Sequence, residues 1–572
     1  MIDMTLFVIM LAIFIAATAF LGWYGYKHTK SNDQFLLGRN KTSPLIIALS
    51  YGATFLSASA VVGFGGQSAK YGMVMIWLVV LNLMIGLIVA FLVYGKRTRR
   101  IGREVGAYTF SDLLGKRYKS PSIRLLSASI ILIGMPIYCA AVLLGGVNFL
   151  ETTLGINKDI ILIGFSVIVA LYVTYGGVIA VMYNDALQAA IMFIGMIVII
   201  VFTYMTLGGD ANLALTNLWD TANPAIIDPL VNQGMNGWTS APDFLSQAWL
   251  TVITTFMLGV GIGALAQPQL VVRFMSAKDD KTLNKSLIIG SIFMIAIVGS
   301  AYTVGALSNV FFDQQFGQIA IEHVPNIDMI IPTYVNELFA GVMFGDIFIV
   351  VFVLALLCAS ISTMSALLHT MGTSAGYDIM SEVKKKKKEE YTDARSLRVT
   401  RICTLLIMVA VVILAYLMPF NIIAKATSIF MGLTAATLLP AYTHSIYSKN
   451  PNLFAAKCSI IVGLISWAIW GFFVNAGIAG ILGIPMIING SLLNFVDPLV
   501  VSLPLSILAM LIALRMRPQK DETPMDQDEL IFKTFGIVTP EYMERHSNTA
   551  PRKSATQKSQ KASVKKNDPS DQ

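Results

Sequence analysis

The segment Ala359-Ser-Ile-Ser-Thr-Met-Ser365 lies inside an apolar run, 347–376, that contains no aspartate, glutamate, lysine or arginine. About 20 residues suffice for a helix to cross a bilayer, so this run predicts a membrane-spanning helix. Small and hydroxyl residues at helical spacing share one of its faces, namely Ala359, Ser362, Thr363, Ala366 and Thr370. Such a face serves close helix packing or binds a cation through its oxygens. The segment by itself leaves both interpretations open.

The composition is that of a polytopic α-helical membrane protein. Of 572 residues, 55% are hydrophobic and 13% are charged, whereas about 25% are charged in soluble domains. The first apolar run, 5–23, has no basic segment before it and no small-residue cleavage site, which favours a retained helix over a removed signal peptide. The cysteines lie in apolar segments and predict neither a disulfide framework nor a metal site; they are Cys139, Cys358, Cys403 and Cys458.

Hydropathy predicts thirteen membrane spans. They are 4–26, 43–66, 72–95, 122–150, 159–182, 185–207, 244–270, 286–310, 344–378, 399–418, 424–446, 456–474 and 496–515. The basic residues test this count, because lysine and arginine gather in cytoplasmic loops. Of the 41 lysines and arginines, only Lys70, Lys158 and Lys425 fall in the alternate loops. This asymmetry predicts an outside N-terminus, a cytoplasmic C-terminus and a plasma-membrane location.

The net charge of +8 therefore belongs to cytoplasmic loops and the tail, and it does not indicate nucleic-acid binding. From residue 518 to 572 the chain is hydrophilic, and we expect a largely disordered cytoplasmic tail. Nothing in the sequence indicates an obligate protein partner. The expected partners are the lipid bilayer and a small organic solute.

Two of the predicted spans carry helix-weakening residues at their centres. Glycines and hydroxyl residues fill 48–66, and 258–269 holds alternating glycines followed by Gln267-Pro268. These spans are five apart, so they cross in opposite directions. Broken helices at matching places in two inverted halves are typical of secondary transporters and mark the substrate site.

The broken helices also suggest a domain organisation. The expected units are an N-terminal peripheral helix with a cytoplasmic loop (1–42), a first inverted repeat of spans 2–6 (43–207), an extracellular loop (208–243), a second inverted repeat of spans 7–11 (244–446), peripheral helices 12 and 13 (447–517) and the tail (518–572).

Ionisable residues at membrane depth are candidates for function. Asp185 is predicted between spans 5 and 6 at the cytoplasmic end, where it would act as a helix N-cap, contact an ion, or do both. His369 lies two turns from Ser362. A single histidine in a helix bundle is more often structural than a proton carrier.

The chain resembles the sodium:solute symporter family over about residues 30–450. The motifs that carry this resemblance, in order, are Phe35-Leu-Leu-Gly-Arg39, Ala53-Thr-Phe-Leu-Ser-Ala-Ser59 with Lys70-Tyr-Gly72, Tyr175-Gly-Gly-Val-Ile-Ala-Val-Met-Tyr-Asn-Asp-Ala-Leu-Gln188, Gln267-Pro-Gln-Leu-Val-Val-Arg-Phe-Met275, Ala359-Ser-Ile-Ser-Thr-Met-Ser365 and Gly376-Tyr-Asp378. The resemblance implies thirteen spans and the inverted five-helix repeats of the leucine-transporter fold.

The same resemblance implies a Na+ site between spans 2 and 9, where Na+ is the transported coupling ion. The implied ligands are backbone carbonyls of Ala53, Leu56 and Ala359 and the hydroxyls of Ser362 and Thr363. Asp185 matches an aspartate for which the family suggests a part in sodium release or a second sodium site. Five uncharged oxygens suit a weakly held monovalent ion, whereas divalent sites normally recruit carboxylates.

The substrate site implied by the resemblance lies at the breaks in spans 2 and 7, with Ser57, Asn82 and Gln267 as candidate residues. Several positions depart from the proline branch: Phe55 replaces an acidic residue, Val260 and Ala264 replace an aromatic pair, and Gln269 replaces a histidine. The Ser57-Ala-Ser59 pattern with Lys70-Tyr-Gly72 leans towards pantothenate and organic acids.

The sequence thus predicts a Na+-coupled symporter that imports an organic acid, pantothenate or an amino acid such as proline by alternating access. Proton coupling through Asp185 or His369 is the nearest alternative. A transporter-like membrane sensor is an alternative of another class, although the tail lacks the length and motifs of a signalling enzyme domain. No nucleophile with a base and no metal-ligand cluster occurs in the spans, so an enzyme is not expected.

Overall fold

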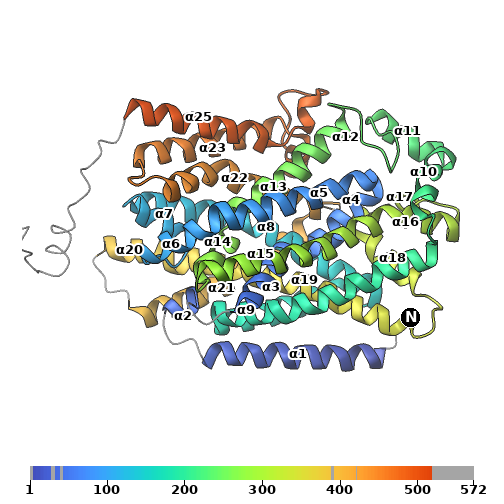
Figure 1. The fold of residues 1–572 in the computed structure, drawn as a ribbon, viewed down its shortest axis with the longest axis horizontal. Helices are drawn as coiled ribbons and strands as arrows, with labels where there is room; N and C mark the ends of the chain where they lie inside the picture. Colours follow the sequence, from blue (N-terminus) through green and yellow to red (C-terminus); the bar gives the residue numbers. More distant parts are fainter. Residues whose placement is uncertain (1–3, 28–31, 39–42, 388–391, 420, 518–572) are drawn as a thin grey trace, which may run out of the picture. The chain divides into compact units, whose positions relative to one another are not determined.

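The computed structural model describes residues 4–27, 32–38, 43–387, 392–419 and 421–517. These residues form helices and no strands (Figure 1). The hydrophilic tail predicted at 518–572 lies outside the described residues, so its predicted disorder stays a prediction.

Eleven helices in the described ranges are long and apolar enough to cross a membrane. They are Met4–Lys27, Ser59–Glu104, Pro121–Leu154, Lys158–Leu207, Gln247–Ala266, Asp280–Phe316, Gly345–Lys386, Asp393–Leu417, Ile423–Tyr447, Leu453–Phe473 and Pro498–Met516. The predicted count of thirteen is not confirmed. One of these helices contains part of the second predicted span and all of the third, and another contains the fifth and the sixth.

The fifth and sixth predicted spans form one helix, α9 (Lys158–Leu207), which is interrupted at Gly177. Gly177 has φ 62° and ψ −166°, a conformation that glycine adopts readily. The prediction of a boundary between residues 182 and 185 was wrong because those polar residues stay helical and find partners inside the protein. Asn184, for example, donates to the Thr18 carbonyl. Asp185 is therefore not a helix N-cap.

The second predicted span is broken at residues 56 and 57, as its glycines and hydroxyls indicated. Helix α3 (Pro44–Phe55) begins with Ser43 as N-cap and ends at Leu56, whose φ and ψ are −92° and 83°. The chain resumes as a π-helix, η1 (Ser59–Gly63), and continues as α4 (Phe64–Tyr71).

The seventh predicted span is broken at Gln267. The π-helix η4 (Thr251–Leu258), α13 (Gly259–Gly263) and a 3-10 turn, η5 (Ala264–Ala266), lead to it, and α14 (Pro268–Ser276) follows it. Gln267 is extended, with φ −72° and ψ 116°. The cause is local: a residue before proline avoids the helical region, and proline suits the first position of a new helix.

Helix α19 (Gly345–Thr373) carries the segment 359–365 and packs mainly against α9 and α8 (Pro121–Leu154). Small residues permit this close packing. A Cβ at Gly195 would lie 2.6 Å from the Ala355 Cβ, and one at Gly146 would lie 2.4 Å from the Ser360 hydroxyl. The packing interpretation therefore holds for part of the α19 surface.

Three of the spans flank these elements: α1 (Met4–Lys27), α23 (Leu453–Phe473) and α25 (Pro498–Met516). Helix α1 packs against α9, and α23 and α25 pack on each other and on the buried helix α22 (Ile423–Tyr447) (Figure 1). The other elements are α2 (Asn32–Leu36), η2 (Gly72–Met75), α5 (Ile76–Leu81), η3 (Asn82–Gly95), α6 (Lys96–Glu104), α7 (Phe110–Arg117), α10 (Ala211–Thr221), α11 (Pro224–Asn232), α12 (Gln247–Leu250), α15 (Asp280–Met294), η6 (Ile295–Gly299), α16 (Ser300–Phe316), α17 (Ala320–His323), η7 (Ile327–Met329), α18 (Ile330–Leu338), η8 (Ser374–Ile379), α20 (Met380–Lys386), α21 (Asp393–Leu417), α24 (Ala476–Leu482) and η9 (Leu492–Phe495).

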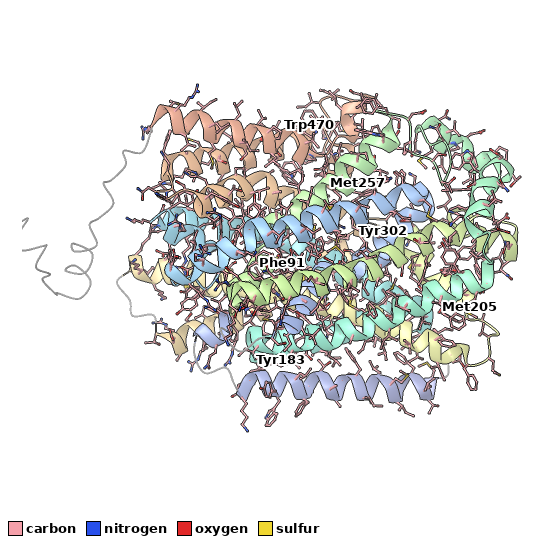
Figure 2. The ribbon with its side chains drawn as sticks, viewed as in Figure 1. Phe91, Tyr183, Met205, Met257, Tyr302 and Trp470 are labelled. Carbon is pink, nitrogen blue, oxygen red and sulfur yellow. The ribbon has the colours of Figure 1, made fainter. Side chains whose placement is uncertain are left out.

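Apolar side chains occupy both the interior and much of the exterior. Phe91 and Tyr302 are buried, whereas 72% of the Met205 side-chain surface is exposed (Figure 2). Many large apolar residues of α1, α9 and α21 are exposed in the same way. This distribution suits a protein whose solvent is lipid.

Candidate functional site

The hydroxyls of α19 meet the broken end of α3. Ser362 Oγ donates to the Ala53 carbonyl at 2.9 Å, and Thr363 Oγ1 lies 3.3 Å from the Ala53 carbonyl and 3.2 Å from the Thr54 carbonyl. Carbonyls in the last turn of a helix lack intrahelical partners, so the break in α3 frees these two. Both hydroxyl-bearing side chains are fully buried.

Four of the five predicted Na+ ligands come together here. Besides the Ala53 carbonyl and the two hydroxyls, the Ala359 carbonyl lies 3.2 Å from Ser362 Oγ. Leu56 lies at the end of α3 with a non-helical backbone, and no hydrogen bond joins its carbonyl to α19 in the described chain. The donor set consists of uncharged oxygens, which suits Na+ and provides no carboxylate for a divalent ion.

Asp185 lies on α9, next to this site, and is paired with an arginine. Its Oδ2 accepts hydrogen bonds from Ser50 Oγ at 2.7 Å, Thr54 Oγ1 at 3.3 Å and Arg273 Nη2 at 3.1 Å. Asp185 and Arg273 are both buried, and among the described residues Asp185 Oδ1 has no hydrogen-bond partner. Thr54 links the two features, since its carbonyl faces Thr363 and its hydroxyl bonds Asp185.

The sequence did not identify Arg273 as a site residue. The pattern of basic residues placed it in a cytoplasmic loop, but every residue of α14, Arg273 included, is buried. A hydropathy window assigns an arginine to a loop because it contains only neighbouring residues. The partner of Arg273 is Asp185, which lies 88 positions away. The Gln267-Pro-Gln-Leu-Val-Val-Arg273 motif was the available signal, because the proline begins a short helix that leads to the arginine.

The predicted substrate residues line the two breaks, but no hydrogen bond joins them to one another in the described part of the chain. Ser57 Oγ lies 2.5 Å from Ser59 Oγ, and Thr427 on α22 donates to Ser59 at 2.9 Å. Gln267 Nε2 donates to Thr434 Oγ1, also on α22, at 2.6 Å. Helix α22 therefore contacts both breaks.

Asn82 begins η3, which packs against α13 and η5 at the second break. Its Oδ1 is buried and without a hydrogen-bond partner, as is Oε1 of Gln269. Asn82, Ser57 and Gln267 are each at most 2% exposed. A solute reaches side chains this deeply buried only when the helices move.

His369 does not join the Ser362 and Thr363 cluster. Its ring centroid lies 5.3 Å from that of Phe35, and no described residue forms a hydrogen bond with its Nε2. The structure places this histidine between helices, which agrees with a structural role.

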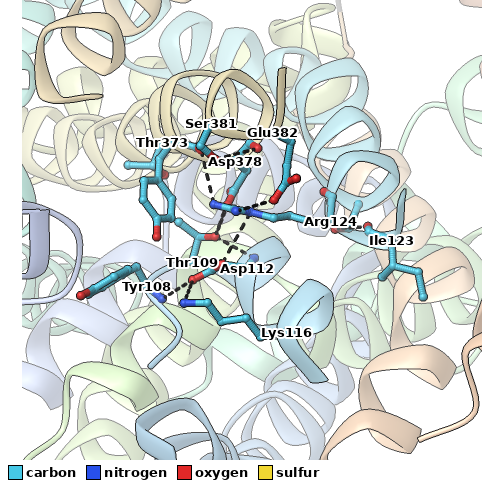
Figure 3. Close-up of polar contacts among 12 residues, drawn as sticks. Tyr108, Thr109, Asp112, Lys116, Ile123, Arg124, Thr373, Asp378, Ser381 and Glu382 are labelled. Carbon is cyan, nitrogen blue, oxygen red and sulfur yellow. Dashed lines mark hydrogen bonds and ion pairs between the residues drawn. The ribbon is translucent and has the colours of Figure 1, made fainter. Parts of the chain in front are cut away.

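A buried ionic network joins α7 and α8 to η8 and α20, the two elements that follow α19 in the chain (Figure 3). Arg124 lies 3.0 Å from Asp378, 3.0 Å from Glu382 and 3.6 Å from Asp112. Asp378 belongs to the Gly376-Tyr-Asp378 motif, for which the sequence offered no role. Its carboxylate also accepts a hydrogen bond from Thr109 at 2.8 Å. The network holds η8 and α20 against α7 and α8.

We expect Arg124→Gln to lower the stability of the protein by about 3 kcal/mol, because breaking a buried ion pair leaves charged groups unpaired. Thermal unfolding of the detergent-solubilised protein measures this. The matched control is Lys116→Gln, since Lys116 pairs with Asp112 at 2.9 Å but 36% of its side chain is exposed; we expect a cost below about 1 kcal/mol. Equal shifts for the two variants would contradict the assignment.

Comparison with known proteins gives matches over most of the chain. A model of the sodium:solute symporter family matches residues 35–463. The osmoregulated proline transporter OpuE of Bacillus subtilis (strain 168) is 27% identical over 500 residues, covering 87% of this chain and 94% of the relative. The sodium/pantothenate symporter of Escherichia coli (strain K12) is 27% identical over 483 residues, covering 84% and 90%.

Among solved structures, a Na+-coupled sialic acid symporter in a substrate-bound outward-open state is 18% identical, with a TM-score of 0.69 and coverage of 90% of this chain and 98% of that chain. At this identity the likeness concerns the fold alone. Together the matches confirm the resemblance inferred from the motifs and the predicted all-helical, leucine-transporter-type fold. The boundaries of the two repeats stay predictions.

Proposed function

Because the chain belongs to the sodium:solute symporter family and couples solute transport to Na+, we propose that it binds Na+ between α3 and α19 and imports a small organic solute by alternating access. The contact of Ser362 and Thr363 with the carbonyls freed at the end of α3 carries this proposal. It supplies uncharged oxygens from two helices at one buried place.

The chain's own groups suggest how Na+ affects conformation. An ion held by Ala53, Ala359, Ser362 and Thr363 joins the broken helix to the continuous one. The ion binds more tightly to the conformation in which α3 and α19 lie together than to one in which they are apart. This difference in affinity shifts the equilibrium towards the first conformation. Solute and Na+ each bind more tightly when the other is present, because coupling is reciprocal.

Asp185 is proposed to act in Na+ release or at a second Na+ site. Its link to the first site through Thr54 supports this role. The guanidinium of Arg273 compensates the negative charge of the Asp185 carboxylate at this buried position. A Na+ ion leaving the α3–α19 site would meet a carboxylate that already has a cationic partner, which limits how long the ion is retained.

The solute is proposed to bind between the breaks in α3–η1 and η5–α14, with Ser57, Asn82 and Gln267 as its polar contacts. The candidates are organic acids, pantothenate and amino acids such as proline. The buried, unpartnered oxygens of Asn82 and Gln269 support a polar ligand at this place, because such atoms are rarely left without a partner.

The membrane orientation is also a proposal: the N-terminus outside, the C-terminus in the cytoplasm and the protein in the plasma membrane. The distribution of basic residues supports it. Na+ then enters down its gradient. A potential of about 100 mV contributes roughly 2.3 kcal/mol per ion, which corresponds to about 50-fold solute accumulation.

Uptake into proteoliposomes tests the proposal. We expect a radiolabelled solute from a panel of proline, pantothenate and sialic acid to accumulate when an inward Na+ gradient is imposed. A proton gradient without Na+ should drive no accumulation. Uptake driven by protons in the absence of Na+ would overturn the assignment of the coupling ion and favour a titrating group such as Asp185.

A further inference from the structure

A cavity of about 220 Å³ lies among the segments that the proposed orientation places at the extracellular face. Its lining includes two lysines (Lys70 and Lys425), one carboxylate (Asp497) and several amide and hydroxyl groups, among them Gln247, Thr251 and Asn475. We propose that this cavity binds the carboxylate of an anionic solute before the solute enters the site between the breaks. This inference rests on the proposed function and specifies its substrate class as organic anions.

The first argument is the placement of charge. Of the 41 basic residues, only three fall in the alternate loops, and two of these three, Lys70 and Lys425, line this one cavity. Neither forms a salt bridge within the described ranges of the chain, although Lys70 Nζ lies 4.9 Å from the centroid of the Tyr71 ring. Because the two ammonium groups line the same cavity they repel each other, and Asp328 offsets part of this repulsion at Lys425. A bound anion relieves that repulsion.

The second argument is the position of Lys425 in the first turn of α22. The N-terminal end of a helix is electropositive, so a lysine there is unfavourable unless an anion is near. Two carboxylates lie near the lysines: Asp328, which attracts Lys425, and Asp497, which lines the cavity and accepts a hydrogen bond from the Leu499 amide at 2.9 Å. In the described part of the chain neither carboxylate forms a salt bridge with Lys70 or Lys425, so both ammonium groups can still contact a ligand.

The third argument is continuity with the proposed solute site. Helix α22 carries Lys425 at the cavity and, nine residues later, Thr434, which accepts the hydrogen bond from Gln267. At ~1.5 Å per residue the two positions are about 13 Å apart. The π-helix η4 also lines the cavity and leads to the break at Gln267. A positively charged cleft raises the local concentration of an anionic substrate.

The first test is the initial rate of uptake into proteoliposomes at a fixed Na+ concentration, with pantothenate as the anion and proline as the zwitterion. We expect Lys70→Gln/Lys425→Gln to raise the KM for pantothenate about tenfold with little change in kcat, and to leave the KM for proline, where proline is carried, unchanged. Lys158→Gln, the third lysine of the alternate loops, is the matched control and should change neither. An unchanged pantothenate KM, or an equal rise for both solutes, would overturn the inference.

The second test does not require transport. An amine-reactive ester labels the lysines of the purified protein, and mass spectrometry measures the rate at each position. We expect pantothenate, but not proline, to slow labelling of Lys70 and Lys425 relative to Lys158. Protection without Na+-driven uptake would contradict the proposed function and leave the anion site standing. Na+-driven uptake without protection by pantothenate would contradict the anion site and leave the proposed function standing.

Discussion

Replacing Ser362 and Thr363 together by alanine is expected to raise the Na+ concentration for half-maximal uptake at least about tenfold. The two hydroxyls are two of the five proposed ligand oxygens and the only ones contributed by side chains. Each lost oxygen contact is worth on the order of 1 kcal/mol, and about 1.4 kcal/mol is a factor of ten in affinity. Solute uptake as a function of Na+ concentration in proteoliposomes measures the change.

A matched control separates Na+ binding from helix packing. Thr370→Ala removes a buried hydroxyl of the same helix, one that donates at 2.8 Å to the Ala366 carbonyl of its own helix. We expect it to leave the Na+ dependence unchanged. Thr363→Ser keeps an oxygen at the site and should retain most of the affinity. If the double alanine variant kept the wild-type Na+ dependence, the Ser362 and Thr363 face would serve packing alone.

The part of the candidate Na+ site that lies on α19 could be predicted because its determinants are local. Helical spacing alone puts Ser362 and Thr363 on one face, and Gln267-Pro268 interrupts a helix through the chemistry of proline. Pairing the α19 face with Ala53 came from the family resemblance, and the structure brings these groups within hydrogen-bond distance. Leu56 is the one proposed ligand whose carbonyl has no hydrogen bond with α19 in the described ranges.

What the sequence missed depends on contacts between distant positions. Arg124 and Asp378 are 254 residues apart, and no local pattern shows that they meet. The boundary predicted between the fifth and sixth spans was misplaced for a related reason. Hydropathy averages over a window, so polar residues such as Asn184 and Asp185 are assigned to a loop, although partners in other helices allow them to stay inside α9.

The buried pair of Asp185 and Arg273 provides the other large expected effect. Arg273→Gln leaves the Asp185 carboxylate buried without a cationic partner, and we expect a loss of about 3–5 kcal/mol in stability together with nearly all transport. The partly exposed pair of Arg99 and Asp280, whose atoms lie 2.7 Å apart, is the control. Asp280→Asn should cost no more than about 1 kcal/mol in the same thermal unfolding experiment.

The double variant Asp185→Asn/Arg273→Gln separates structure from function at this pair. With both charges removed, no unpaired charge stays buried, so we expect most of the lost stability to return; a double-mutant cycle measures how much. Transport should not return with it, because the proposed role of Asp185 in Na+ release requires its carboxylate. Recovery of both stability and Na+-driven uptake would show that the pair only holds α14 against α9, and the proposed part of Asp185 in the Na+ pathway would then be wrong.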